Sequence, residues 1–86
     1  MQSTHINRLL QVRVENVLEC FIQPRFTSPD EEISAIATFE GEVELRGLVN
    51  DARLVDEAIR RIMDLHGVTH VKDNVIVTRT GTAIEL

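Results

Sequence analysis

The chain has 86 residues, enough for one domain, and 43% of them are hydrophobic, which is too many for a disordered chain. Its net charge of −5, its nine scattered basic residues and its lack of Trp and Tyr argue against binding to nucleic acid. The single cysteine, Cys20, excludes an intrachain disulfide, and no apolar run approaches the length that spans a membrane.

The first predicted element is a helix over residues 4–22, because apolar residues recur there at helical spacing. Ser3 or Thr4 is the expected N-cap. On a uniform wheel the apolar residues spread over roughly 200°, against about 100° for a helix that buries one face. We therefore expect this helix to offer part of its apolar surface to a partner. The candidate interface residues on its flank are Val12, Leu18 and Ile22.

A connector, QPRFTSPDEE, carries both prolines, and Ser28 to Glu32 has the composition of a helix start that extends for at most one turn. The next stretch, ISAIATF, alternates in hydropathy and leads through Glu40-Gly41 into VELRGLV, which alternates as well. Two alternating stretches around a glycine turn indicate a β-hairpin. A helix over residues 29–39 is the competing interpretation of the first stretch.

Gly47 interrupts the apolar side of the second stretch, where Val43, Leu45 and Val49 are expected to face the core. Glycine inside a strand costs about 0.5–1 kcal/mol relative to alanine. A bulge or the close approach of another backbone usually accounts for such a glycine. Because a helix is expected directly afterwards, we interpret Gly47 as the place where a helix backbone lies close to the sheet.

A second helix is predicted from the cap Asn50-Asp51 to about Leu65. Its apolar residues form one stripe, and its charged residues occupy the opposite side. Gly67 is expected to end this helix in the left-handed conformation. Residues 68–77 are then expected to form the third strand.

The predicted order is therefore α-β-β-α-β. It corresponds to an α+β, two-layer domain in which two helices pack on one face of a three-stranded mixed sheet. The second and third strands should be parallel, because the connection between them is expected to be right-handed. A polar row on the second strand predicts a wet outer face, where Leu48 and Ile76 are further candidate interface residues. The domain is expected to span residues 1–80, with residues 81–86 as a flexible C-terminal tail.

Residues 41–77 combine a hairpin glycine, the pattern V-x-L-x-G-x-V, a helix with spaced alanines, G-V-x-x-V, a polar pair and an alternating apolar end. The positions that carry this combination are Gly41, Val43, Leu45, Gly47, Val49, Ala52, Ala58, Gly67, Val68, Val71, Asp73, Asn74, Val75 and Val77. It resembles the BON domain, a family named for bacterial osmotic-stress and nodulation proteins. The first helix and first strand match that family only in type.

The resemblance implies a non-catalytic domain, for which binding to phospholipid or to the envelope surface is the usual proposal. BON domains usually occur in tandem or beside other modules in exported or membrane-associated bacterial proteins, whereas this chain shows one copy and no signal peptide. An ungapped comparison with the family places Ile36 and Thr38 on the inner face of the first strand. The alternation of the sequence instead places four other residues there: Ile33, Ala35, Ala37 and Phe39.

Few residues have the spacing of a chemical site. The histidines are His5, His66 and His70, and the last two flank the end of the second helix, but a metal site needs three or four converging ligands. Cys20 has no basic neighbour and is expected to be a half-buried, inert thiol. Glu42 and Glu44 point the same way, but nothing supplies the pocket that a glycosidase needs. The GXXG loop of KH nucleic-acid modules is absent.

We therefore expect a non-catalytic binding module without a cofactor, which docks another protein or self-associates, a dimer being favoured. The alternative is a phospholipid-binding module. The best basic group for lipid lies on the second helix: Arg53, Arg60 and Arg61. Acidic residues interleave with these arginines within a Debye length of about 8 Å and offset their charge. As given, the chain is expected in the cytoplasm, or in the periplasm or at the envelope if a signal peptide has been removed.

Overall fold

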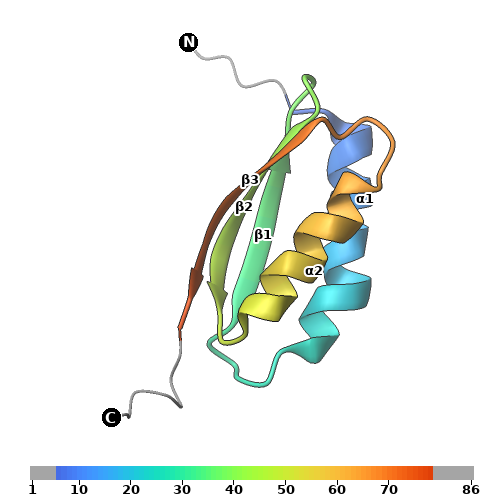
Figure 1. Cartoon of the computed structure of the whole chain (residues 1–86). Helices are drawn as coiled ribbons and strands as arrows, with labels where there is room; N and C mark the ends of the chain where they lie inside the picture. The colour runs from blue at the N-terminus through green and yellow to red at the C-terminus, as the bar shows by residue number, and fades with distance from the viewer. Residues whose placement is uncertain (1–5, 79–86) are drawn as a thin grey trace.

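The computed structural model describes residues 6–78, which form two helices and a three-stranded sheet (Figure 1). The elements in chain order are α1 (Arg8–Val17), a π-helical turn η1 (Leu18–Ile22), a 3-10 turn η2 (Gln23–Arg25), β1 (Glu32–Ala37), β2 (Glu42–Val49), α2 (Ala52–Met63) and β3 (His70–Val77). The predicted order and the α+β class are confirmed, and the competing helix over residues 29–39 is wrong. The tail predicted at residues 81–86 lies outside the described residues.

The sheet has the order β1-β2-β3, with β1 antiparallel and β3 parallel to the central strand β2. Figure 1 shows both helices on the same side of this sheet. On that side Val43, Leu45 and Val49 are fully buried. On the other side Glu44 accepts hydrogen bonds from Arg46 (2.9 Å) and Asn74 (2.7 Å), as the polar row predicted. The core therefore lies between β2 and the helices.

The inner face of β1 follows the hydropathy alternation. Ile33, Ala35 and Ala37 are all buried, so the facing taken from the ungapped family comparison is wrong. Phe39 does not follow the same pattern, because the strand ends at Ala37 and the chain turns there. Its side chain is 66% exposed instead of facing the core.

Helix α1 begins later than predicted. Its N-cap is Asn7, whose side-chain oxygen accepts a hydrogen bond from the N–H of Leu10 at 3.1 Å. The residue before the cap belongs to the sheet instead, because Ile6 forms an antiparallel bridge with Thr38. The expected caps Ser3 and Thr4 lie outside the described residues, and the helix does not reach them.

The π-helical turn η1 explains why Leu18 and Ile22 are not surface residues. Each four-residue step advances a position by about 40° around an α-helix, so the series Val14, Leu18, Ile22 would drift off the core face. A π turn holds more residues than an α turn and rotates Ile22 back; in it the N–H of Gln23 donates to the carbonyl of Leu18. Leu18 is 2% exposed and Ile22 is fully buried. The prediction that they lie exposed on the flank of the helix is therefore wrong.

Helix α2 forms as its sequence predicted. Asp51 is the N-cap, and its side chain accepts a hydrogen bond from the N–H of Arg53 at 2.9 Å. The apolar stripe is buried against the sheet and α1, and its buried members are Leu54, Val55, Ala58 and Ile62. Gly67 follows with a φ of +98°, the left-handed conformation expected at the end of a helix.

The close neighbour of Gly47 is a strand and not a helix. Its φ is +147°, which side chains rarely adopt. A Cβ placed on it would clash with the carbonyl oxygen of Glu32 and would lie 2.8 Å from the Cα of Ile33, both in β1. The predicted contact with a helix backbone is therefore wrong. Gly47 is required because the backbone of the adjacent strand β1 lies too close to it for a side chain. The turn glycine, Gly41, is restricted in the same way by the carbonyl oxygen of Gly67.

Replacing Gly47 should show this requirement. Gly47→Ala combines a disfavoured φ with a backbone clash, so we expect it to lower the free energy of unfolding by about 3 kcal/mol or more. Gly67→Ala is the matched control, because its φ is also positive but no atom lies within 4 Å of the added Cβ. It should lose only about 1 kcal/mol. Equal losses in urea denaturation would show that the clash with β1 is unimportant.

Candidate binding surfaces

The residues singled out for chemistry do not come together. His66 and His70 are both exposed, and within residues 6–78 no three His, Cys, Asp or Glu side chains converge on a position that could hold a metal ion. Glu42 and Glu44 lie on the outer face of the sheet. Cys20 is exposed, which corrects the expected half-buried thiol. His5 lies outside the described residues. The candidate sites are therefore surfaces that could bind a partner.

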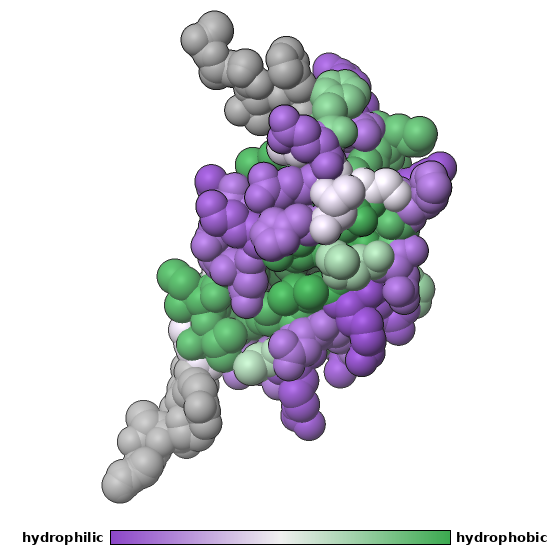
Figure 2. Space-filling view, turned by 45° about the horizontal axis from the view of Figure 1, so that its top comes forward, coloured by the Kyte–Doolittle hydropathy of each residue, from purple (hydrophilic) through white to green (hydrophobic). Residues whose placement is uncertain are grey.

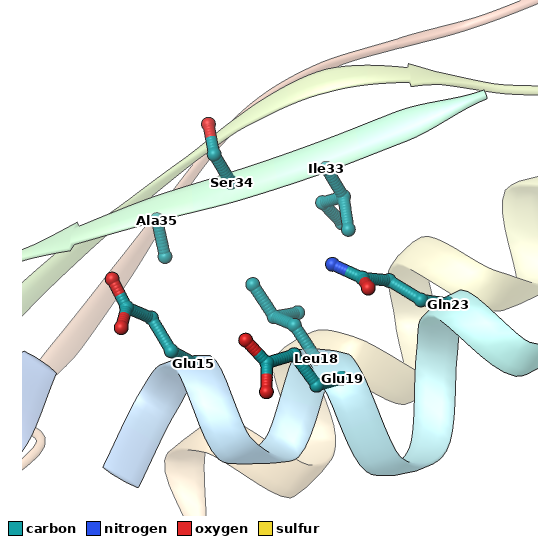
Figure 3. Close-up of a pocket in the computed structure, with 7 residues that line it drawn as sticks. All are labelled: Glu15, Leu18, Glu19, Gln23, Ile33, Ser34 and Ala35. Carbon is teal, nitrogen blue, oxygen red and sulfur yellow. The ribbon is translucent and has the colours of Figure 1, made fainter. Parts of the chain in front are cut away.

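A groove of about 200 Å³ runs between β1 and the helical segment above it (Figure 3). Its residues are Glu15, Leu18, Glu19, Gln23, Ile33, Ser34 and Ala35. In Figure 3, Glu15, Glu19 and Gln23 reach from the helical side toward β1, while Ser34 points away from the helix. Leu18, Ile33 and Ala35 are buried and form an apolar floor. The groove thus has an apolar base and an acidic, exposed rim.

The groove follows an edge of the sheet, because β1 pairs only with β2. The carbonyl of Ala35 accepts a hydrogen bond from Gln11 Nε2, and the N–H of Ala37 donates to Gln11 Oε1, both at 2.8 Å. The carbonyl of Ala37 accepts from the N–H of Asn7 at 3.0 Å. The odd-numbered residues of β1 therefore turn their backbone groups away from β2. Gln11 and Asn7 occupy one half of that edge.

The other half of the edge borders the groove at Ile33 and Ala35, which are 6% and 7% exposed. Backbone direction alternates along a strand, so the N–H and C=O of Ile33 and the N–H of Ala35 also point away from β2. No group within residues 6–78 pairs with these three. No pattern in the sequence indicates this arrangement, because the side chain that covers the neighbouring positions, Gln11, comes from a different element. An open edge of this kind is a template for another strand.

On the opposite edge of the sheet, along β3, a side chain covers one of the backbone donors. The N–H of Val75 donates to the side chain of Asp73 at 3.0 Å, so an acidic side chain covers a donor that another strand would use. Charged residues on edge strands are a common protection against edge-to-edge pairing. Of the two sheet edges, β1 is therefore the one with open backbone groups beside a groove.

Exposed apolar side chains on α1 and on the outer sheet face include predicted interface residues. On α1, Leu9 is 65% and Val12 is 53% exposed. On the outer sheet face, Ile76 is 62% exposed and pairs across the strands with the half-buried Leu48. Figure 2 shows apolar surface beside the end of β3, bordered by polar side chains. The predicted interface residues Val12, Leu48 and Ile76 thus reach the surface, but on opposite layers, so they do not form one patch.

The three arginines proposed for lipid contact do not form a free basic face. Arg53 pairs with its neighbour Asp51 at 3.1 Å, and the pKa of that carboxyl is lowered by the hydrogen bond from Arg53. Arg61 pairs with Glu57 at 2.8 Å and stacks on the ring of Phe21, 3.9 Å from its centroid. Only Arg60 has no ion pair within residues 6–78.

The carboxylate of Glu57 holds two segments together. It accepts hydrogen bonds from Arg61 of its own helix and from Arg25 of η2, and these bonds lower its pKa. Together with the stacking of Arg61 on Phe21, this network ties the end of the first helical segment to α2. Its arginines are therefore committed to internal contacts. Asp56 and Arg60, which have the same spacing as Glu57 and Arg61, do not form an ion pair.

Glu31 is a structural acid that the sequence did not reveal. It is only 7% exposed, yet no basic side chain pairs with it in the described part of the chain. Its carboxylate accepts hydrogen bonds from the backbone N–H of Thr27 (2.6 Å), Ser28 (3.0 Å) and Asn50 (2.8 Å). The bond from Asn50 is the largest cause of a lowered pKa at Glu31. Glu31 thereby fastens the β1 connector to the start of α2.

The lowered pKa makes this contact dependent on pH. The stability from Glu31 is fully present above its ordinary pKa of 4.5 and is lost as the pH falls through the lower folded-state value. At neutral pH, Glu31→Gln should lower the free energy of unfolding by about 1–3 kcal/mol. At low pH the difference from the parent chain should shrink, because both side chains are then uncharged. Glu32→Gln, at an exposed neighbour, should be neutral throughout; a pH-independent loss at Glu31 would contradict the role of its charge.

Comparisons with known proteins do not indicate what these surfaces bind. A scan against protein-family models finds no match, and a search of curated proteins finds no similar sequence. The resemblance to BON domains therefore stays a prediction. Within residues 6–78, neither helix has the length and apolar character needed to cross a bilayer. The compartment also stays a prediction.

Proposed function

We propose that this chain is a non-catalytic binding module that docks another protein or a second copy of itself. The observation that carries this proposal is the outer face of α1. Leu9 and Val12 lie one turn apart there and are 65% and 53% exposed, on the side away from the buried Leu10 and Val14. Covering such apolar surface contributes about 25 cal/mol per Å² removed from water. A domain of this size has a small core and gains stability from association.

The distribution of ionisable groups also favours binding over catalysis. Glu15 and Glu19 share the β1 groove, but its lining contains no histidine, cysteine or basic residue. The most buried acid, Glu31, accepts hydrogen bonds from three backbone N–H groups. Acid–base chemistry needs a group with an adjusted pKa that can reach a substrate. The described acids are instead either exposed or held in structural contacts.

If α1 carries the contact, the chain should form a dimer at roughly micromolar concentration. Val12→Glu places a charge in the centre of that face and should shift sedimentation to the monomer without changing the fold, because Val12 is outside the core. Ile22→Glu would instead unfold the domain, since Ile22 is fully buried.

Ile76→Glu is the matched control for this dimer. Like Val12→Glu, it replaces an exposed β-branched residue with glutamate, but it does so on the outer sheet face. It should leave sedimentation unchanged. Dissociation by Ile76→Glu alone would move the contact to the sheet, and a parent chain that is monomeric at high concentration would argue against self-association through either face.

The phospholipid alternative has weaker support. A polybasic segment gains about 1 kcal/mol per basic residue near an anionic leaflet, but Arg53 and Arg61 are paired with acids, which leaves Arg60. The helix α2 also has little apolar surface to insert, because its stripe is buried in the core and its one large exposed apolar side chain is Met63, at its end. The family resemblance alone favours this function.

Vesicle flotation separates the two functions. We expect negligible binding to phosphatidylglycerol vesicles at physiological salt, because the ion pairs of α2 cancel most of the attraction. Binding that is lost in Arg60→Glu/Arg61→Glu, and retained in Val12→Glu, would favour the lipid function over protein docking.

A further inference from the structure

We propose that the groove beside β1 binds an extended, basic peptide segment of a partner protein, which adds to the sheet as a fourth strand next to β1. This inference rests on the proposed docking function and names its site and the class of its partner. Strand addition to an open sheet edge is a general mode of peptide recognition, in which the backbone gives affinity and the side-chain pockets give specificity.

The backbone of β1 provides the first half of the site. The N–H and C=O of Ile33 and the N–H of Ala35 face away from β2 and open onto the groove, while Gln11 occupies the next two positions with bonds of 2.8 Å. An incoming strand would therefore pair around Ile33 and stop where the side chain of Gln11 crosses the edge. Gln11 thus limits the length of the added strand and fixes where it ends.

The side chains select what kind of strand fits. On the helical side, the incoming residues would lie over the buried floor made by Leu18 and would reach the carboxylates of Glu15 and Glu19 (Figure 3). Lysine matches both features, because its stem is apolar and its head is charged. Glu15 is already oriented by a 2.8 Å bond from Gln11, and no residue that lines the groove is basic. The electrostatics therefore favour a basic segment.

The same charges argue against a second copy of this chain as the occupant. Pairing two β1 edges would bring Glu15 and Glu19 of both copies to one junction, where like charges repel. The dimer expected through α1 uses Leu9 and Val12, neither of which lines the groove, although Val12 lies one turn from Glu15. The two contacts can be tested separately.

The test uses a labelled heptapeptide in which lysine alternates with valine, titrated against the intact chain and followed by fluorescence anisotropy. Two further peptides isolate the two interactions: one with glutamate in place of lysine, and one with the backbone amides N-methylated, which removes the donors of a strand. We expect binding of the first peptide only. Hydrogen exchange should slow at the amides of Ile33 and Ala35 when it binds.

Two charge variants locate the site. Glu15→Lys/Glu19→Lys should weaken binding by about tenfold or more, because both changed residues line the groove. Asp56→Lys/Asp64→Lys changes the net charge equally at exposed positions of α2 and its end, and it should weaken binding by about twofold or less.

The outcomes distinguish this site from the docking function in general. Equal effects of the two charge variants, binding of the N-methylated peptide, or no binding of the lysine peptide would each overturn the groove proposal. The dimer measured with Val12→Glu does not involve the groove. If that dimer forms while the peptide fails to bind, the docking function stands and only this site is wrong.

Discussion

The close approach of the β1 backbone to Gly47 of β2 is the constraint on which the rest of the domain depends. With β1 this near, the register of the antiparallel pair is fixed with Ile33 opposite Gly47. That register turns Ile33, Ala35 and Ala37 toward the helices, and a shift by one residue would expose all three. Because β2 also pairs with β3, both outer strands take their positions from this central strand.

The two edges of the sheet follow from its small size. Three strands leave two unpaired edges, and each has a different cover in this domain. The side chain of Asp73 covers one backbone donor of β3. On β1, Gln11 and Asn7 from the first helical region bond to backbone groups of Ala35 and Ala37. These contacts do not reach Ile33. The open stretch and the acidic rim of α1 then coincide, which is why the groove combines backbone and charge recognition.

Several charged side chains of the described residues take part in internal contacts. Glu57 joins two arginines from different elements, Glu44 joins Arg46 and Asn74, and Glu31 is satisfied by backbone donors alone. A buried carboxylate with several N–H donors and no cation is stable as the anion because those donors replace water. The acids without an ion pair in the described part of the chain include Glu19, which lines the groove, and others elsewhere on the surface, such as Glu42 and Asp56.

Local sequence determined the elements and their facing, because hydropathy period, caps and turn glycines act over a few residues. It predicted the α-β-β-α-β order, the parallel pairing of β2 and β3 and the stripe of α2. For β1 it left two facings open, of which the hydropathy alternation was right for Ile33, Ala35 and Ala37. Only the tertiary structure decided that Ile22 is buried and that β1 is the close neighbour of Gly47. It also decided that backbone donors hold the carboxylate of Glu31 and that Gln11 bonds to β1. Each of these depends on groups from distant segments, or on a π turn that a uniform helical wheel cannot represent. The physical reason is that patterns in sequence report which face is buried, whereas contacts between elements depend on how those faces are brought together.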